Sequence, residues 1–153
     1  MLSAAILSTA VSCKDKASST CVDVKIAVPE RDSTALKNYI TSNNIPAEFD
    51  SRGFYYKILN PGSDKKPSQC ATIMIDYSGK LVNGTVFDSN TNQNFSLLSL
   101  ISGWRMGVPL IGEGGEIVLY LPPALGYGDE DNGPIPGGSV TIFTVKLHSI
   151  TKD

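Results

Sequence analysis

The amino-acid sequence predicts an α+β protein in which an antiparallel β-sheet packs on one short helix and follows a helical N-terminal extension. Residues 139–150, SVTIFTVKLHSI, alternate between apolar and polar side chains, which is the period of a half-buried strand. Asn83-Gly84 lies between two short apolar runs and is typical of a tight hairpin turn. The 14 glycines and 9 prolines, concentrated in the C-terminal half, also favour a fold rich in turns.

The first residues of the chain resemble a targeting signal. MLSAAILSTAVS is small and apolar, and Cys13 follows it directly. Such a run is too short to span a bilayer, which takes about 20 residues, and it fits the apolar region of an export signal. Small residues before a cysteine also resemble a bacterial lipobox, so we expect a signal segment at residues 1–13 and a lipid on Cys13. The alternative is a start of the chain without any targeting role.

A tether and a helix are expected next. Residues 14–29 begin polar and rich in serine, which is typical of a tether between an anchor and a domain. Residues 32–44, DSTALKNYITSNN, carry one apolar stripe at helical spacing, with Asp32 or Ser33 as the cap. Two asparagines and then Pro46 end this pattern.

The remaining elements read mainly as strands. The runs rich in β-branched and aromatic residues are FYYKIL (54–59), ATIMIDY (71–77), KLVNGTVFD (80–88), EIVLYL (116–121) and the strand of residues 139–150. Pro122-Pro123 ends the fourth of these, because proline cannot donate to a β-ladder. The segment from Leu98 to Val108 is the helical candidate within this region.

Composition excludes several classes of function. The net charge of −2 gives no electrostatic reason to expect binding to nucleic acid or to an anionic membrane surface. A metal site is not expected, because there is no C-x-x-C spacing and His148 is the single histidine. If Cys13 carries a lipid, Cys21 and Cys70 remain as a possible disulfide pair in an oxidising compartment.

Four ordered blocks of sequence resemble the FKBP-type peptidyl-prolyl isomerase family. The blocks are YSGKLVNGTVFDS (77–89), FSLLSLISGWRMGV (95–108), LPPALGYG (121–128), and PIP (134–136) with the final strand. The resemblance implies an FKBP-like antiparallel sheet wrapped around one short helix. It divides the chain into an N-terminal extension with a helix and first strand at residues 30–66 and an isomerase domain at residues 67–153. The extension resembles that of small exported bacterial members.

The resemblance also implies a site and its substrate. Matching positions suggest that the catalytic residues are Tyr77, Phe87, Asp88, Trp104, Tyr127 and Phe143, and that the substrate-binding residues are Phe95, Leu100, Ile101 and Ile135. The expected substrate is a proline-containing polypeptide, whose proline ring would enter an apolar cleft above the Trp104 indole. Macrolide inhibitors of the family are possible further ligands. No cofactor is implied, since rotation about an amide needs no nucleophile, metal or general base.

The sequence departs from the archetypal small members in ways that bear on the site. The segment between Asp88 and Trp104 is shorter, and the arginine that usually pairs with the cleft aspartate has no counterpart. One usual aromatic wall is also missing, with Phe95 as the candidate replacement, and the 128–135 loop lacks the archetype's histidine. These changes leave the expected floor of the pocket intact and put macrolide affinity in question.

Three functions therefore remain distinct at this point. The first is an active isomerase that assists the folding of exported proteins at the periplasmic side of the bacterial envelope, anchored by lipid on Cys13, or soluble if Cys13 is unmodified. The second is an FKBP-fold chaperone or peptide-binding module without catalysis. The third is a purely structural lipoprotein, which the set of aromatic residues disfavours.

Overall fold

The computed structural model describes residues 21–153. The expected signal segment at residues 1–13, which includes Cys13, and residues 14–20 of the expected tether lie outside the described residues. Within residues 21–153, the structure contains no helix that is long and apolar enough to cross a membrane.

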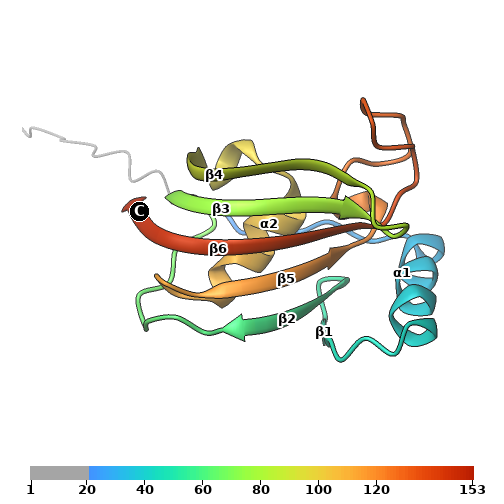
Figure 1. The fold of residues 1–153 in the computed structure, drawn as a ribbon, viewed down its shortest axis with the longest axis horizontal. Helices are drawn as coiled ribbons and strands as arrows, with labels where there is room; N and C mark the ends of the chain where they lie inside the picture. Colours follow the sequence, from blue (N-terminus) through green and yellow to red (C-terminus); the bar gives the residue numbers. More distant parts are fainter. Residues whose placement is uncertain (1–20) are drawn as a thin grey trace, which may run out of the picture.

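One six-stranded antiparallel sheet organises the described chain, in the order β1-β2-β5-β6-β3-β4 (Figure 1). The elements are α1 (Glu30–Ser42), β1 (Glu48–Asp50), β2 (Phe54–Asn60), β3 (Thr72–Leu81), β4 (Val86–Ser96), α2 (Ser102–Gly107), β5 (Glu116–Leu121) and β6 (Thr141–Lys152). Short 3₁₀ turns at Leu97–Ser99, Val108–Leu110 and Pro123–Leu125 connect them. The expected α+β class and antiparallel sheet are confirmed.

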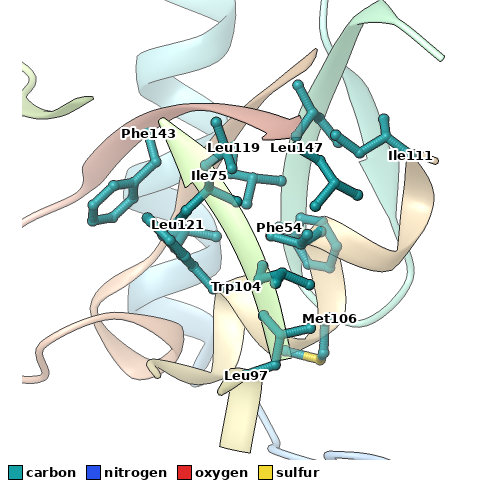
Figure 2. Packing of buried hydrophobic residues seen from close by; sticks show 14 of the residues in the cluster. Phe54, Ile75, Leu97, Trp104, Met106, Ile111, Leu119, Leu121, Phe143 and Leu147 are labelled. Atoms are coloured by element: carbon teal, nitrogen blue, oxygen red, sulfur yellow. The ribbon is translucent and has the colours of Figure 1, made fainter. Parts of the chain in front are cut away.

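The inner face of the sheet packs on α2. Odd-numbered residues of β5 and β6, among them Leu119, Phe143 and Leu147, are buried against Trp104 and Met106 of α2 (Figure 2). A Cβ atom on Gly103 or Gly107 would overlap the side chains of Leu121 and Leu119. The two glycines therefore allow this short helix to lie close to β5, which places Trp104 between the helix and the sheet.

The outer face of the sheet carries α1 at one end (Figure 1). Leu36 and Ile40 of α1 form a second apolar cluster with Tyr120, Val140 and Ile142. Tyr120 of β5 and Ile142 of β6 are even-numbered, whereas the residues of these two strands that face α2 are odd-numbered. This alternation is what a half-buried strand pattern predicts. The helix begins at Glu30 rather than Asp32, and the Asp32 side chain is not its cap. Asp32 is instead buried and accepts a hydrogen bond from the Ala124 N–H at 3.0 Å.

Residues 89–96 are a second difference from expectation, because the predicted strand run ends at residue 88 and β4 continues to Ser96. Every strand pairing in this part is with β3, from Tyr77 with Asn90 to Thr72 with Ser96. A register shift between Ile75 and Tyr77 and a positive φ at Asn92 accommodate the irregular stretch. Hydrogen bonding to β3 thus overrides the low β-propensity of asparagine.

A disulfide joins the start of the described chain to the strand region. Cys21 and Cys70 are bonded, so the pairing that the sequence left open is present in the structure. The segment that follows Cys21 lies along the domain, where the Val24 N–H donates to Gln69 Oε1 at 2.9 Å. Val24 and Val28 pack on the main core, which anchors this segment before α1 begins.

Candidate active site

A cleft of about 300 Å³ opens beside α2, between β3, β4 and the segment after β5. Its lining residues are Tyr77, Asp88, Phe95, Ser99, Leu100, Ile101, Trp104, Tyr127 and Phe143. Three larger hollows on the described residues, of about 550, 580 and 420 Å³, are lined by one aromatic side chain, none and one, respectively. The smaller cleft is therefore the candidate site, because its chemistry and not its size distinguishes it.

Trp104 forms the floor of the cleft. Its side chain is 4% exposed, and its indole makes edge contacts with the rings of Tyr77 at 5.3 Å and Phe143 at 5.2 Å between centroids. The planes of these pairs are 77° and 86° apart, which is a favourable T-shaped arrangement of aromatic rings. A five-membered ring of a ligand could therefore lie flat on a rigid apolar surface between two aromatic walls.

A second row of rings supports these walls. Phe87 contacts Phe143 at 5.6 Å and Tyr127 at 6.0 Å, again edge to face, but it does not line the cleft itself. A Cβ atom on Gly79 would come within 2.6 Å of Phe143 and 2.8 Å of Phe87. Glycine at position 79 thus allows the two phenylalanine rings to close over β3.

The polar side chains of the cleft include two phenols and one carboxylate. The Tyr77 hydroxyl donates to Asp88 Oδ2 at 2.8 Å. Burial and this hydrogen bond raise the pKa of Tyr77 to about 12. Burial and the charge of Asp88 also raise the pKa of Tyr127. Both phenols are therefore protonated near neutral pH, so the Tyr77 hydroxyl donates to Asp88 and the Tyr127 hydroxyl can donate to a ligand.

A backbone donor completes the rim. Ile101 immediately precedes α2, and its carbonyl oxygen accepts a hydrogen bond from the first turn of this helix, from the Trp104 N–H at 3.0 Å. Within residues 21–153 the Ile101 N–H itself donates no hydrogen bond. It is the orphan N–H of a helix start, and a carbonyl oxygen bound in the cleft would satisfy it.

All expected site residues except Phe87 and Ile135 line the cleft. Phe87 lies behind the wall, and Ile135 is 5% exposed and paired with Asn132 in an isolated β-bridge. Ser99 also lines the cleft although the sequence did not single it out. Its position at the end of a 3₁₀ turn, directly before Leu100 and Ile101, is the signal that the sequence offers. Among residues 21–153, no group of three or more side chains is suited to hold a metal ion.

Comparison with known families identifies the family to which this fold belongs. The model of the FKBP-type peptidyl-prolyl cis-trans isomerase family matches residues 63–148, more than half of the chain. The chain belongs to this family. The antiparallel sheet and the short helix packed on it agree with the FKBP-like fold that the sequence predicts.

Relatives of the FKBP family support this identification. A probable FKBP-type isomerase FkpA of Neisseria meningitidis is 39% identical over 103 residues, which are 64% of this chain and 38% of that protein. The chain thus spans about two fifths of the length of the curated relatives it matches. The crystal structure of FkpA from Escherichia coli, 28% identical, superposes with a TM-score of 0.72 over 80% of this chain and 60% of that one. An isomerase structure from Pseudomonas syringae, 26% identical, gives 0.71 over 83% and 99%.

Proposed function

We propose that this chain accelerates cis/trans isomerisation of peptide bonds that precede proline. The observation that carries the proposal is the aromatic cleft, with Trp104 as its floor and Tyr77 and Phe143 at right angles to it. A pyrrolidine ring is small, flat and apolar, and this cleft offers a matching surface. Family membership supports the same reaction.

The chemistry required of the site is modest but specific. The peptide bond has partial double-bond character, and its rotation meets a barrier of about 18–20 kcal/mol. In the twisted transition state the amide loses resonance, so its carbonyl oxygen becomes less negative and its nitrogen becomes pyramidal. An apolar, water-poor cleft disfavours the planar dipolar amide more than the twisted form. The enzyme thus binds the transition state more tightly than the ground state, and no bond between heavy atoms changes.

We assign roles to the residues on this basis. Trp104, Tyr77, Phe95 and Phe143 hold the proline ring, and Leu100 and Ile101 provide the aliphatic edge. The Ile101 N–H and the Tyr127 hydroxyl are placed to donate to substrate carbonyls on either side of the proline. Asp88 fixes the Tyr77 ring through its hydroxyl. Phe87 and Ile135 act indirectly, by supporting the wall and the adjoining loop.

The cellular setting forms a second part of the proposal: the chain assists folding of exported proteins in the bacterial envelope, held there by a lipid on Cys13. The disulfide between Cys21 and Cys70 supports an oxidising compartment, where such bonds persist. The apolar start of the sequence before Cys13 supports export. Labelled palmitate should be incorporated in the natural host, and the Cys13→Ser variant should abolish the labelling.

A protease-coupled assay with a proline-containing tetrapeptide tests the catalytic proposal. The full chain should accelerate the slow phase, and a macrolide inhibitor of the family that occupies the cleft should suppress this gain. Tyr127→Phe should lower kcat/KM by about two- to tenfold, which is the effect of one lost hydrogen bond. Tyr39→Phe, a tyrosine on α1 outside the cleft, is the matched control and should leave the rate unchanged.

The same assay separates the alternatives. An intact fold that binds the peptide without any gain in rate would favour a binding module over an isomerase. Equal rates for the wild type, Tyr127→Phe and Asp88→Val would show that the reaction does not take place in this cleft.

A further inference from the structure

The cleft carries one formal charge. Of its lining residues, Asp88 is the single carboxylate, and no lysine, arginine or histidine lines this part of the described chain. Asp88 lies on β4 at the exposed rim. Its carboxylate accepts a hydrogen bond from Tyr77, which is a neutral donor and leaves the charge of Asp88 uncompensated.

The nearest cation along the paired strands faces away from the cleft. On β3, Gly79 pairs with Asp88 and with Phe143 of β6, and this row belongs to the inner face. Lys80, one residue further, pairs with Ile142, which packs in the outer cluster beneath α1. Successive residues of a strand point to opposite faces, so the Lys80 ammonium group cannot neutralise Asp88 from within the cleft.

Ion pairing elsewhere does not neutralise Asp88 either. Within residues 21–153, the cations in ion pairs are held by Asp32, Asp50, Asp76, Glu113 and Asp129, and none of the pairs involves Asp88. The charge of the carboxylate also acts on Tyr127, another lining residue, because after burial it is the second cause of the raised pKa of that tyrosine. A peptide bound above Trp104 would therefore meet a rim of negative potential.

We infer that this cleft prefers a proline flanked by a basic residue, lysine or arginine, and disfavours a proline flanked by an acidic residue. The inference rests on the proposed function, since it assumes that the proline ring occupies the aromatic cleft. Asp88 then has two roles: it fixes the Tyr77 ring, and it selects the charge of the residue next to the proline. Because the rim is exposed, water and salt screen the attraction and the selection is moderate.

Binding can be measured without reference to catalysis, because Trp104 is the single tryptophan of the chain and forms the floor of the cleft. The probes are two series of peptides, Ala-Xaa-Pro-Ala and Ala-Ala-Pro-Xaa, with lysine, glutamine or glutamate at Xaa. Their ends are acetylated and amidated, so that the side chain at Xaa carries the only charge. Quenching or shift of the Trp104 emission gives a Kd for each peptide. The account expects the lysine peptide to bind about three- to tenfold more tightly than the glutamate peptide in at least one series.

The Asp88→Asn variant isolates the charge, because asparagine keeps the shape and an oxygen that can accept from Tyr77. The ratio of the two Kd values should fall close to one in Asp88→Asn and in about 0.5 M salt, where screening is strong. Asp64→Asn, an exposed aspartate outside the cleft, is the matched control and should keep the wild-type ratio.

The outcomes are distinguishable from a failure of the proposed function. Equal Kd values for lysine and glutamate peptides in both series, or a preference that persists in Asp88→Asn, would overturn the inference. Peptides that bind with the expected charge preference but are not isomerised would support the inference and contradict the catalytic proposal. Peptides that leave the Trp104 emission unchanged would overturn both, because the cleft would then not be the binding site.

Discussion

The hydroxyl of Tyr77 shows how a single hydrogen bond sets the chemistry of the cleft. It is partly buried and donates to Asp88, and both conditions favour the neutral phenol over the phenolate. The folded state therefore binds this proton more tightly than the unfolded chain, in which the phenol has its usual pKa of 10. The stabilisation is complete below the unfolded pKa and disappears as the pH rises through about 12.

An alkaline titration of stability tests this assignment. Between about pH 10 and about 12, the wild type should lose more free energy of unfolding than the Tyr77→Phe variant. Tyr56, Tyr120 and Tyr127 also have raised pKa values, but they are present in both proteins and cancel in the comparison. Urea unfolding at a series of pH values measures the difference. A difference between the two proteins that does not change over this range would show that the Tyr77 proton is not held by the fold.

Gly79 affects the site through the space it leaves empty. The rings of Phe143 and Phe87 occupy the space that a Cβ atom of residue 79 would take, and these rings support the wall beside Trp104. Gly79→Ala should therefore cost about 1–3 kcal/mol of stability through overpacking, and should lower kcat/KM by displacing Phe143.

The control for this change is Gly84→Ala in the hairpin turn between β3 and β4. Gly84 has a φ of +89° and nothing within 4 Å of its absent Cβ, so alanine there strains the backbone without touching a ring. It should lower stability by about 1 kcal/mol and leave kcat/KM of the folded protein unchanged. Similar activity losses in the two variants would contradict the role given to Gly79.

Among the elements, α1 acts on the site from a distance. Asp32 is 3% exposed and accepts from the Ala124 N–H in the 3₁₀ turn that leads to Tyr127. Arg31 bridges Asp32, at 3.0 Å, to Asp129 just beyond that tyrosine, at 2.8 Å. The helix thus holds both ends of the segment that places the Tyr127 hydroxyl.

Removal of the Asp32 carboxylate should weaken this connection. Asp32→Ala leaves the Ala124 N–H without its partner and should cost about 1–3 kcal/mol, measured as a shift of the urea midpoint. Asp32→Asn keeps an acceptor oxygen and should cost less. If both variants were as stable as the wild type, α1 would be only packed on the sheet and not fastened to this segment.

The elements differ in how far the sequence predicts them. The sequence predicts β6 from its twelve-residue alternation and the turn between β3 and β4 from Asn83-Gly84, because each of these signals is local. The continuation of β4 through residues 89–96 has no such signal, since its asparagines become a strand only by pairing with β3. The role of Asp32 is likewise invisible, because its partner Ala124 lies 92 positions away in the chain.

For the molecule as a whole, the disulfide between Cys21 and Cys70 closes a loop over 49 positions of sequence. A disulfide across a loop of this length stabilises the folded state by about 4 kcal/mol, because it lowers the conformational entropy of the unfolded chain. Reduction with dithiothreitol should therefore lower the free energy of unfolding of the wild type by up to about this amount. The Cys21→Ser/Cys70→Ser double variant should be less stable from the start and insensitive to the reductant. Unchanged wild-type stability on reduction would mean that the bond contributes nothing to this fold.

The aromatic cleft was predictable because the order and spacing of its residues follow the FKBP pattern, not because any one of them signals function. The sequence cannot separate a ring that lines the cleft from one that supports it, so Phe87 and Phe143 look alike. Ile135 lies on the expected loop but is buried and does not line the cleft, which its position in the sequence does not reveal. The one signal for Ser99 is its position directly before Leu100 and Ile101, because a single serine in a short turn has no pattern of its own.

The central claim is that a proline ring sits on Trp104 while its peptide bond rotates. Nuclear magnetic resonance of a proline tetrapeptide with a substoichiometric amount of the full chain measures both parts at once. The account predicts cis/trans exchange cross-peaks that are absent without the protein, together with Overhauser contacts between the proline ring protons and the Trp104 indole. Accelerated exchange with contacts to some other surface, or indole contacts without any acceleration, would contradict it.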